Sequence, residues 1–196
     1  MKVFYLLTCC VFFQSLIQPG YSSLRLNTDN WQVAHYGKDT FESFNHTGYV
    51  SLDGTKVLNQ TTINGYLQAR FAGFHDLLVI GHVKIEDSWV YHKTNIEGGL
   101  FAINVQFSKL TCRSSKVLLS HCRVSDLLIQ IPEDEEEQYV ILCDGTEISG
   151  DVIFESGKGT ILASEDSIPK VVRGGRIEVK NISKKYQSTH LEDDIK

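Results

Sequence analysis

Three stretches of seven residues decide the fold: Ile63-Asn64-Gly65-Tyr66-Leu67-Gln68-Ala69, Val79-Ile80-Gly81-His82-Val83-Lys84-Ile85 and Ile96-Glu97-Gly98-Gly99-Leu100-Phe101-Ala102. Each has apolar residues at its first, fifth and seventh positions and a glycine at its third. The interval from Val79 to Ile96 is one position longer than the interval from Ile63 to Val79. Side chains two positions apart share one face of a β-strand. A self-similar repeat of this length indicates a solenoid in which each turn adds the same strand to the same wall.

The pattern extends beyond these copies in both directions. Residues 49–52 precede them and end in Asp53-Gly54, a strong turn signal, and later copies cover 118–124, 148–154 and 172–179. We therefore predict an all-β solenoid of about six to seven turns over residues 47–180, each turn holding three short strands. The glycine is expected at a corner or at a close backbone approach. The predicted core of the repeat comprises Ile63, Leu67, Val79, Val83, Ile85, Ile96, Leu100, Ile148, Val152 and Phe154.

The chain begins with a segment typical of an export signal. Met1-Lys2 supplies a positive charge, residues 3–17 are mostly apolar, and Pro19 and the small residues after it end the run. We predict a signal peptide over residues 1–22 and hence a periplasmic or extracellular protein. The mature chain is expected to have no transmembrane span, because the apolar run is shorter than the roughly 20 residues that cross a bilayer. A lipoprotein signal ending at Cys9 is the alternative.

Residues 23–46 precede the repeat and are rich in aromatic side chains. They are Trp31, Tyr36, Phe41 and Phe44. The first turn of a solenoid exposes core and an unpaired strand edge, which another segment usually covers. Residues 23–46 therefore form either an N-terminal cap or a loosely ordered remnant.

Two polar segments lie outside the repeat pattern. Residues 131–138 contain five consecutive acidic residues after a proline, and like charges with no core to face predict a solvated loop. A calcium site there would need ligands spaced along a turn with a glycine, which this run lacks. Residues 181–196 are polar and mixed in charge, and we predict a flexible tail.

Three cysteines remain after the leader, and an odd number implies at least one free or intermolecular thiol. If residues 131–138 are an excursion, the segment ending at Cys112 aligns with the segment ending at Cys143. Adjacent turns lie about 4.8 Å apart, which is within the range of a disulfide. We predict that any bond joins Cys112 and Cys143, with two stacked buried thiols as the alternative.

No residue pattern indicates catalysis. The net charge of -5 argues against nucleic acid as a partner. Some solenoid enzymes cleave polysaccharides with clustered carboxylates, but outward-facing acids are also what solubility requires. We expect no enzymatic activity and no cofactor. The acidic residues considered are Glu86, Asp87, Glu97, Asp151 and Glu155.

His75 and His92 are separated by the same interval as Val79 and Ile96, so we expect them side by side on adjacent turns. A zinc site there would need a third ligand, either Asp76 or Asp87. A simple surface ladder is the preferred interpretation, and we expect no bound metal.

The repeat of this chain, as in Ile148-Ser149-Gly150-Asp151-Val152 and Ile63-Asn64-Gly65, resembles the repeat of the bactofilins, the polymer-forming cytoskeletal proteins of bacteria. The chain is also similar to uncharacterised exported bacterial β-helix proteins, through Val50-x-Leu52-Asp53-Gly54-Thr55 and Phe154-Glu155-Ser156-Gly157-Lys158-Gly159. The resemblance covers roughly residues 48–180. It implies a single-stranded right-handed β-helix of short triangular turns that polymerises end to end without nucleotide. The leader, the acidic loop and the possible cap depart from the bactofilin pattern.

These features favour a non-enzymatic scaffold of the cell envelope, whose partner is a further copy of itself. The alternative is a secreted module that binds a polysaccharide or a host protein on one flat wall. The candidate residues of that wall are Tyr66, Trp89 and Tyr91.

Overall fold

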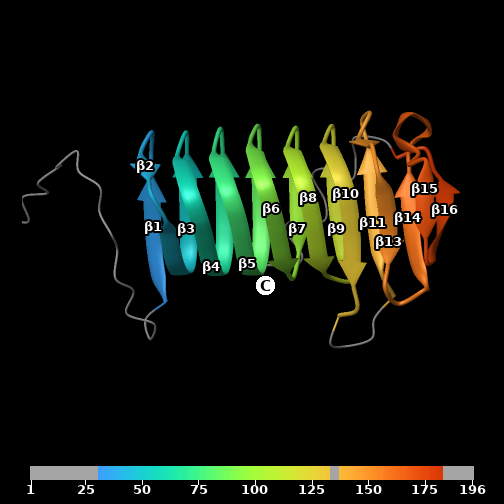
Figure 1. Ribbon diagram of the computed structural model, residues 1–196, viewed down its shortest axis with the longest axis horizontal. Helices are drawn as coiled ribbons and strands as arrows, with labels where there is room; N and C mark the ends of the chain where they lie inside the picture. Colours follow the sequence, from blue (N-terminus) through green and yellow to red (C-terminus); the bar gives the residue numbers. More distant parts are fainter. Residues whose placement is uncertain (1–30, 133–136, 183–196) are drawn as a thin grey trace, which may run out of the picture.

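The computed structural model describes residues 31–132 and 137–182. The predicted signal peptide, the start of the possible cap, the centre of the acidic loop and the tail from residue 183 lie outside the described residues. The described chain is an all-β parallel solenoid of about eight turns, stacked along the long axis of the molecule (Figure 1). Among the described residues the only helical element is one turn of 3-10 helix, η1 (Glu165–Ser167).

All strand pairings are parallel, and the strands form one sixteen-stranded sheet that winds around the core. The strands are β1 (Gln32–Tyr36), β2 (Thr40–Phe41), β3 (Phe44–Asp53), β4 (Lys56–Arg70), β5 (Gly73–Glu86), β6 (Trp89–Glu97), β7 (Leu100–Ile103), β8 (Gln106–Arg113), β9 (Lys116–Ser120), β10 (Arg123–Gln130), β11 (Tyr139–Cys143), β12 (Glu147–Ile148), β13 (Asp151–Phe154), β14 (Gly159–Ala163), β15 (Val171–Arg173) and β16 (Gly175–Val179).

Three walls surround the core, and we number them by the residues stacked in each. The first wall contains residues 49–53 and the segments that stack on them. The second wall contains the column Phe41, Val57, Phe74, Val90, Phe107, Val124 and Ile148. The third wall contains the column His46, Ile63, Val79, Ile96, Cys112, Ile129 and Phe154.

The longest core column runs through the first wall from β1 to β16. Its members are Ala34, Val50, Leu67, Val83, Leu100, Val117, Val140, Ile161 and Ile177. All members from Val50 to Ile161 are buried in one continuous apolar cluster, which also contains every residue predicted for the repeat core. Because each layer is covered by the next, only the two ends of the column meet solvent.

The repeated glycine lies where the third wall meets the first. Gly48, Gly65, Gly81 and Gly98 have φ angles of 119, 138, 134 and 128°. A Cβ atom on Gly81 would lie 1.9 Å from the carbonyl oxygen of Gly65, and the same clash recurs along the column. The corner therefore requires glycine both for its backbone conformation and for the close approach of adjacent turns.

The alternation between shorter and longer turns arises where the second wall meets the third. At this corner β4 and β6 each have two residues where β5 and β8 have one, between otherwise registered pairs. Each extra residue is a bulge, which bends the strand and redirects side chains. In β6 the two residues are Tyr91 and His92.

The solenoid begins at Gln32, earlier than the boundary at residue 47 expected from the sequence. β1 pairs with β3 in continuous register from Gln32 and Gly48 to Tyr36 and Leu52. Three of the four aromatic residues of this segment pack together in the first turn, with ring centroids 5.2–5.4 Å apart, whereas Trp31 is exposed: the three are Tyr36, Phe41 and Phe44. The prediction of six to seven turns was therefore too low, because it excluded this turn.

The acidic loop is an extension of one corner. The chain leaves the third wall after Gln130 and re-enters the first wall at Tyr139. Buried Gln138 fixes the return, because its side-chain amide donates to the Gln130 carbonyl at 2.6 Å and accepts from Ser156 Oγ at 2.6 Å. Glu133 to Glu136 lie outside the described residues.

The pairing of Cys112 with Cys143 predicted from the sequence is wrong. All three described cysteines are free. Cys112 stacks between Ile96 and Ile129 in the third wall, whereas β11 places Cys143 on Ser120 in the first wall. The loop lengthens a corner and does not return the chain to the wall it left, so the two cysteines fall on different walls. Burial raises the pKa of Cys122 to about 12 and that of Cys143 to about 11, which keeps both as thiols at neutral pH.

Two of the three later copies of the repeat occupy different corners from the first three, whereas the copy at 172–179 passes from the third wall in β15 to the first wall in β16, as they do. Ile148 belongs to the second wall and Phe154 to the third, so Gly150 lies between these walls and outside the glycine column. The sequence pattern gives the spacing of inward-facing residues but not the corner that they flank.

Candidate functional site

The structure separates the three aromatic residues predicted to form a binding wall. Tyr66 lies on the first wall and stacks on Tyr49, with ring centroids 5.5 Å apart and planes 16° apart. Trp89 and Tyr91 lie together on the second wall, with ring centroids 6.3 Å apart in an edge-to-face arrangement. Only this second pair can contact one ligand together.

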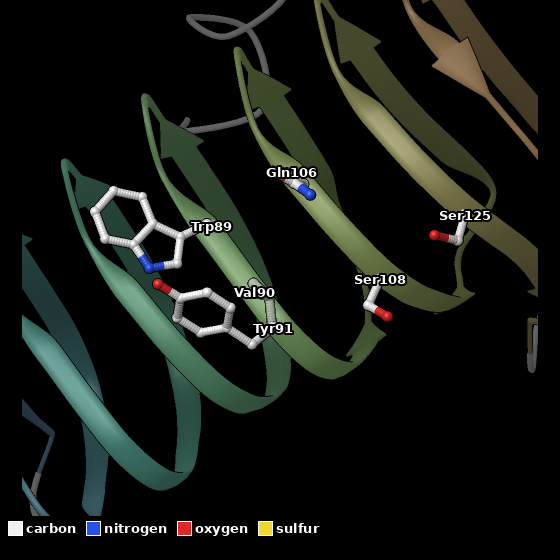
Figure 2. Close-up of a pocket in the computed structure, with 6 residues that line it drawn as sticks. All are labelled: Trp89, Val90, Tyr91, Gln106, Ser108 and Ser125. Atoms are coloured by element: carbon white, nitrogen blue, oxygen red, sulfur yellow. The ribbon is translucent and has the colours of Figure 1, made fainter.

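Trp89 and Tyr91 border a shallow groove of about 460 Å³ on the second wall. Polar side chains from the following turns complete it: Gln106, Ser108 and Ser125. Figure 2 shows the two aromatic rings on one turn and the polar groups on the turns beside it. Aromatic surface beside a few polar groups is a common feature of small-ligand sites.

The flat position of Trp89 depends on the turn before it. Gly73 is registered beside Trp89, and a Cβ atom at residue 73 would lie 2.5 Å from the indole nitrogen. A larger residue there would force the indole away from the wall. The spacing of the groove residues was a usable signal in the sequence: Tyr91, Ser108 and Ser125 follow one another at the longer repeat interval, which places them side by side on successive turns.

Next to the groove, three metal-ligating side chains converge. His92 Nδ1 lies 2.7 Å from Asp76 Oδ1, and His75 Nδ1 lies 3.3 Å from Asp76 Oδ2. Burial alone would raise the pKa of Asp76, but hydrogen bonds and charge from His92 and His75 outweigh it and lower that pKa. Asp87, the other expected partner, lies at the corner between the first and second walls, where it accepts from Asn104 Nδ2 at 2.7 Å.

The carboxylates considered for catalysis have separate partners. Glu86 pairs with Lys84 at 3.1 Å, Asp87 with Arg70 at 3.9 Å, Glu97 with Arg113 at 3.6 Å, and Asp151 with Arg173 at 2.8 Å, while Glu155 accepts from Gln130 at 3.4 Å. These contacts distribute the acids over several corners and strands. The structure does not assemble them into a paired acid and base.

The C-terminal end of the stack exposes core positions. Within the described residues β16 pairs only with β14. Ile177 and Val179 continue two core columns but are 37% and 52% exposed, whereas Ile161 and Ala163, one turn below, are fully buried. Charged side chains alternate with these apolar positions along the strand. Glu178 forms ion pairs with Arg176 at 3.1 Å and with Lys180 at 3.2 Å.

No protein-family model matches the chain, and no significant match was found among curated proteins or solved structures. The structure shows the β-solenoid that the resemblance to bactofilins implies, but it does not show membership of that family. In the described part of the chain, no helix has the length and apolar character needed to cross a bilayer.

Proposed function

We propose that this protein is a non-enzymatic, exported scaffold of the cell envelope that associates end to end with further copies of itself. The observation that carries the proposal is the exposure of Ile177 and Val179 on the last strand. These side chains belong to columns that are buried everywhere in the middle of the stack. A strand edge of this kind also presents backbone N–H and C=O groups to a new strand.

The first strand of a second copy offers the matching positions. Ala34 and Tyr36 begin the same two columns that Ile177 and Val179 end. If β1 of the second copy lies on β16 as each strand lies on the one before, Ile177 stacks on Ala34 and Val179 on Tyr36. Glu178 then faces His35. This contact joins unlike ends, so it repeats without closing and produces a filament.

The test is sedimentation and negative-stain microscopy of the protein at micromolar concentration, comparing wild type with Ile177→Asp. Ile153→Asp is the matched control: Ile153 is also 37% exposed, but it lies on the third wall in β13, which is paired on both sides. We expect filaments or longer rods from wild type and from Ile153→Asp, and single short rods from Ile177→Asp. Single rods from wild type, or filaments from Ile177→Asp, would contradict the proposal.

A second candidate function is supported by the groove at Trp89 and Tyr91. We propose that this groove binds a polysaccharide chain, because aromatic faces contact the apolar faces of sugars and the neighbouring polar groups accept and donate hydrogen bonds. Affinity electrophoresis in gels that contain polysaccharide tests this. Trp89→Ala should remove any retardation, and Tyr66→Ala, on another wall, should not. Equal retardation of the two variants would exclude the groove.

A further inference from the structure

The structure assigns a further site on a side wall: we propose that His75, Asp76 and His92 bind one Zn²⁺ ion. The ligand atoms of all three side chains lie within 4.8 Å of one another. His75 and Asp76 come from β5, and His92 comes from β6, one turn further along the chain. The two imidazole rings lie with centroids 5.3 Å apart, and their Nδ1 atoms approach different oxygens of the shared carboxylate.

The site depends on the bulge in β6. Phe74 is registered with Val90 and Asp76 with Lys93, so His75 alone faces both Tyr91 and His92. A turn without the extra residue would have one side chain at this corner. The bulge adds a second, and His92 reaches back to Asp76 at 2.7 Å. The bulge in β4 carries Leu58 and Asn59 at the equivalent place, so a bulge by itself does not create the cluster.

The donor set suits zinc. Zinc sites with three protein ligands commonly combine imidazole nitrogens with a carboxylate and leave the fourth position to water, with bonds of about 2.0–2.2 Å. Calcium and magnesium prefer all-oxygen ligands, so two histidines select against them. Both Nδ1 atoms already point at the two carboxylate oxygens. The ion would replace the protons that these hydrogen bonds hold, with only small side-chain movements.

All three side chains are accessible from solvent, so the ion enters without opening the fold. His92 directly follows Tyr91, which lines the groove on the second wall. Because the site lies on a side wall and not at either end, zinc binding is independent of end-to-end association.

Calorimetric titration of zinc into the metal-free protein tests the proposal. We expect one ion per chain, and we expect His75→Ala, Asp76→Asn and His92→Ala each to weaken binding by at least roughly tenfold. His82→Ala is the control, because His82 is exposed on the first wall, and it should bind zinc like wild type. Circular dichroism of each variant checks that the fold is retained, which these exposed positions favour.

Cobalt substitution separates this site from the cysteines. The cobalt protein should show the visible bands of nitrogen and oxygen ligation with no thiolate charge-transfer band, and His92→Ala should lose them. Failure to bind zinc, binding that the three variants leave unchanged, or a thiolate band that persists in His92→Ala would each overturn the proposal.

Discussion

The two halves of the solenoid differ in how their corners are built. Up to Gly98, every passage from the third wall to the first uses one column of glycines at positive φ. In the next turn Ser114 stands at this corner in place of glycine. Its hydroxyl accepts a hydrogen bond from the Lys116 amide at 3.0 Å and donates one to the Lys116 carbonyl at 2.8 Å. The following turn carries the acidic loop at the same corner. The insertion therefore lies at a turn without the carbonyl-to-glycine contact, which recurs later at Gly174, where a Cβ atom would lie 2.2 Å from the Phe154 carbonyl oxygen.

The largest effect should come from the glycine column. Gly81→Ala places a Cβ atom 1.9 Å from a carbonyl oxygen at φ +134°, so we expect a loss of roughly 3–5 kcal/mol in the free energy of unfolding. Gly157→Ala in the second half meets no atom within 4 Å and only has to adopt φ +71°, so it should cost about 1–2 kcal/mol. Urea denaturation measures both, and equal losses would remove the distinction between the halves.

Core truncations should show the same gradient from the middle of the stack to its end. Leu67→Ala, inside the first half, should cost about 2–5 kcal/mol, because neighbouring turns cannot collapse into the cavity. Ile177→Ala removes a side chain that is 37% exposed, so it should cost about 1 kcal/mol in the single rod. Thermal unfolding at low protein concentration compares them. A loss for Ile177→Ala as large as for Leu67→Ala would mean that the last turn is packed like the others.

The first half could be read from the sequence because stacking repeats the same side chain at the same place. Leu67, Val83 and Leu100 follow one another at a nearly fixed interval, and the glycine before each marks the same corner. The first turn has no glycine at this corner, because Gln32 occupies the position that pairs with Gly48, and the sequence pattern therefore did not predict this turn. The disulfide prediction failed for a related reason: spacing cannot show which wall a chain joins after a loop.

The candidate sites were less predictable than the core. The spacing of His75 and His92 correctly predicted that they lie side by side. Which aspartate joins them, Asp76 or Asp87, depended on the bulge in β6, which only the strand register shows. The separation of Tyr66 from Trp89 and Tyr91 likewise depends on the wall to which each residue belongs. Residues 66 and 89 differ by an interval that is not a whole number of turns, and this is the signal that they lie on different walls.

A smaller effect should distinguish two buried threonines. Thr94 lies between Leu77 and Leu110, and within the described residues its Oγ1 has no hydrogen-bond partner. Thr94→Val should therefore stabilise the fold by about 1 kcal/mol, since it removes an unsatisfied polar group. Thr55→Val is the control: Thr55 Oγ1 donates to the Gly37 carbonyl at 2.6 Å, and its loss should destabilise by about 1–2 kcal/mol. Denaturation curves in which both variants change in the same direction would refute this interpretation.

The smallest effect concerns Asp76. Its folded-state pKa is lowered, so its contribution to stability is present above the unfolded value and is lost as the pH falls through the folded value. In metal-free buffer at pH 7, Asp76→Asn should be less stable than wild type by under about 1 kcal/mol, because the contact is exposed and screened. The difference should begin to shrink as the pH falls towards the ordinary carboxyl pKa of 3.8, and it should vanish once the pH is below the lowered folded-state pKa. A difference that grows on acidification would contradict the lowered pKa.

Hydrogen–deuterium exchange followed as a function of protein concentration tests end-to-end association most directly. The account predicts that amides of β1 and β16 gain protection together as concentration rises, while those in the middle of the stack keep the same protection throughout. Exchange at both ends that does not depend on concentration, or protection gained only on a side wall, would show that the exposed last strand is not where copies of this protein meet.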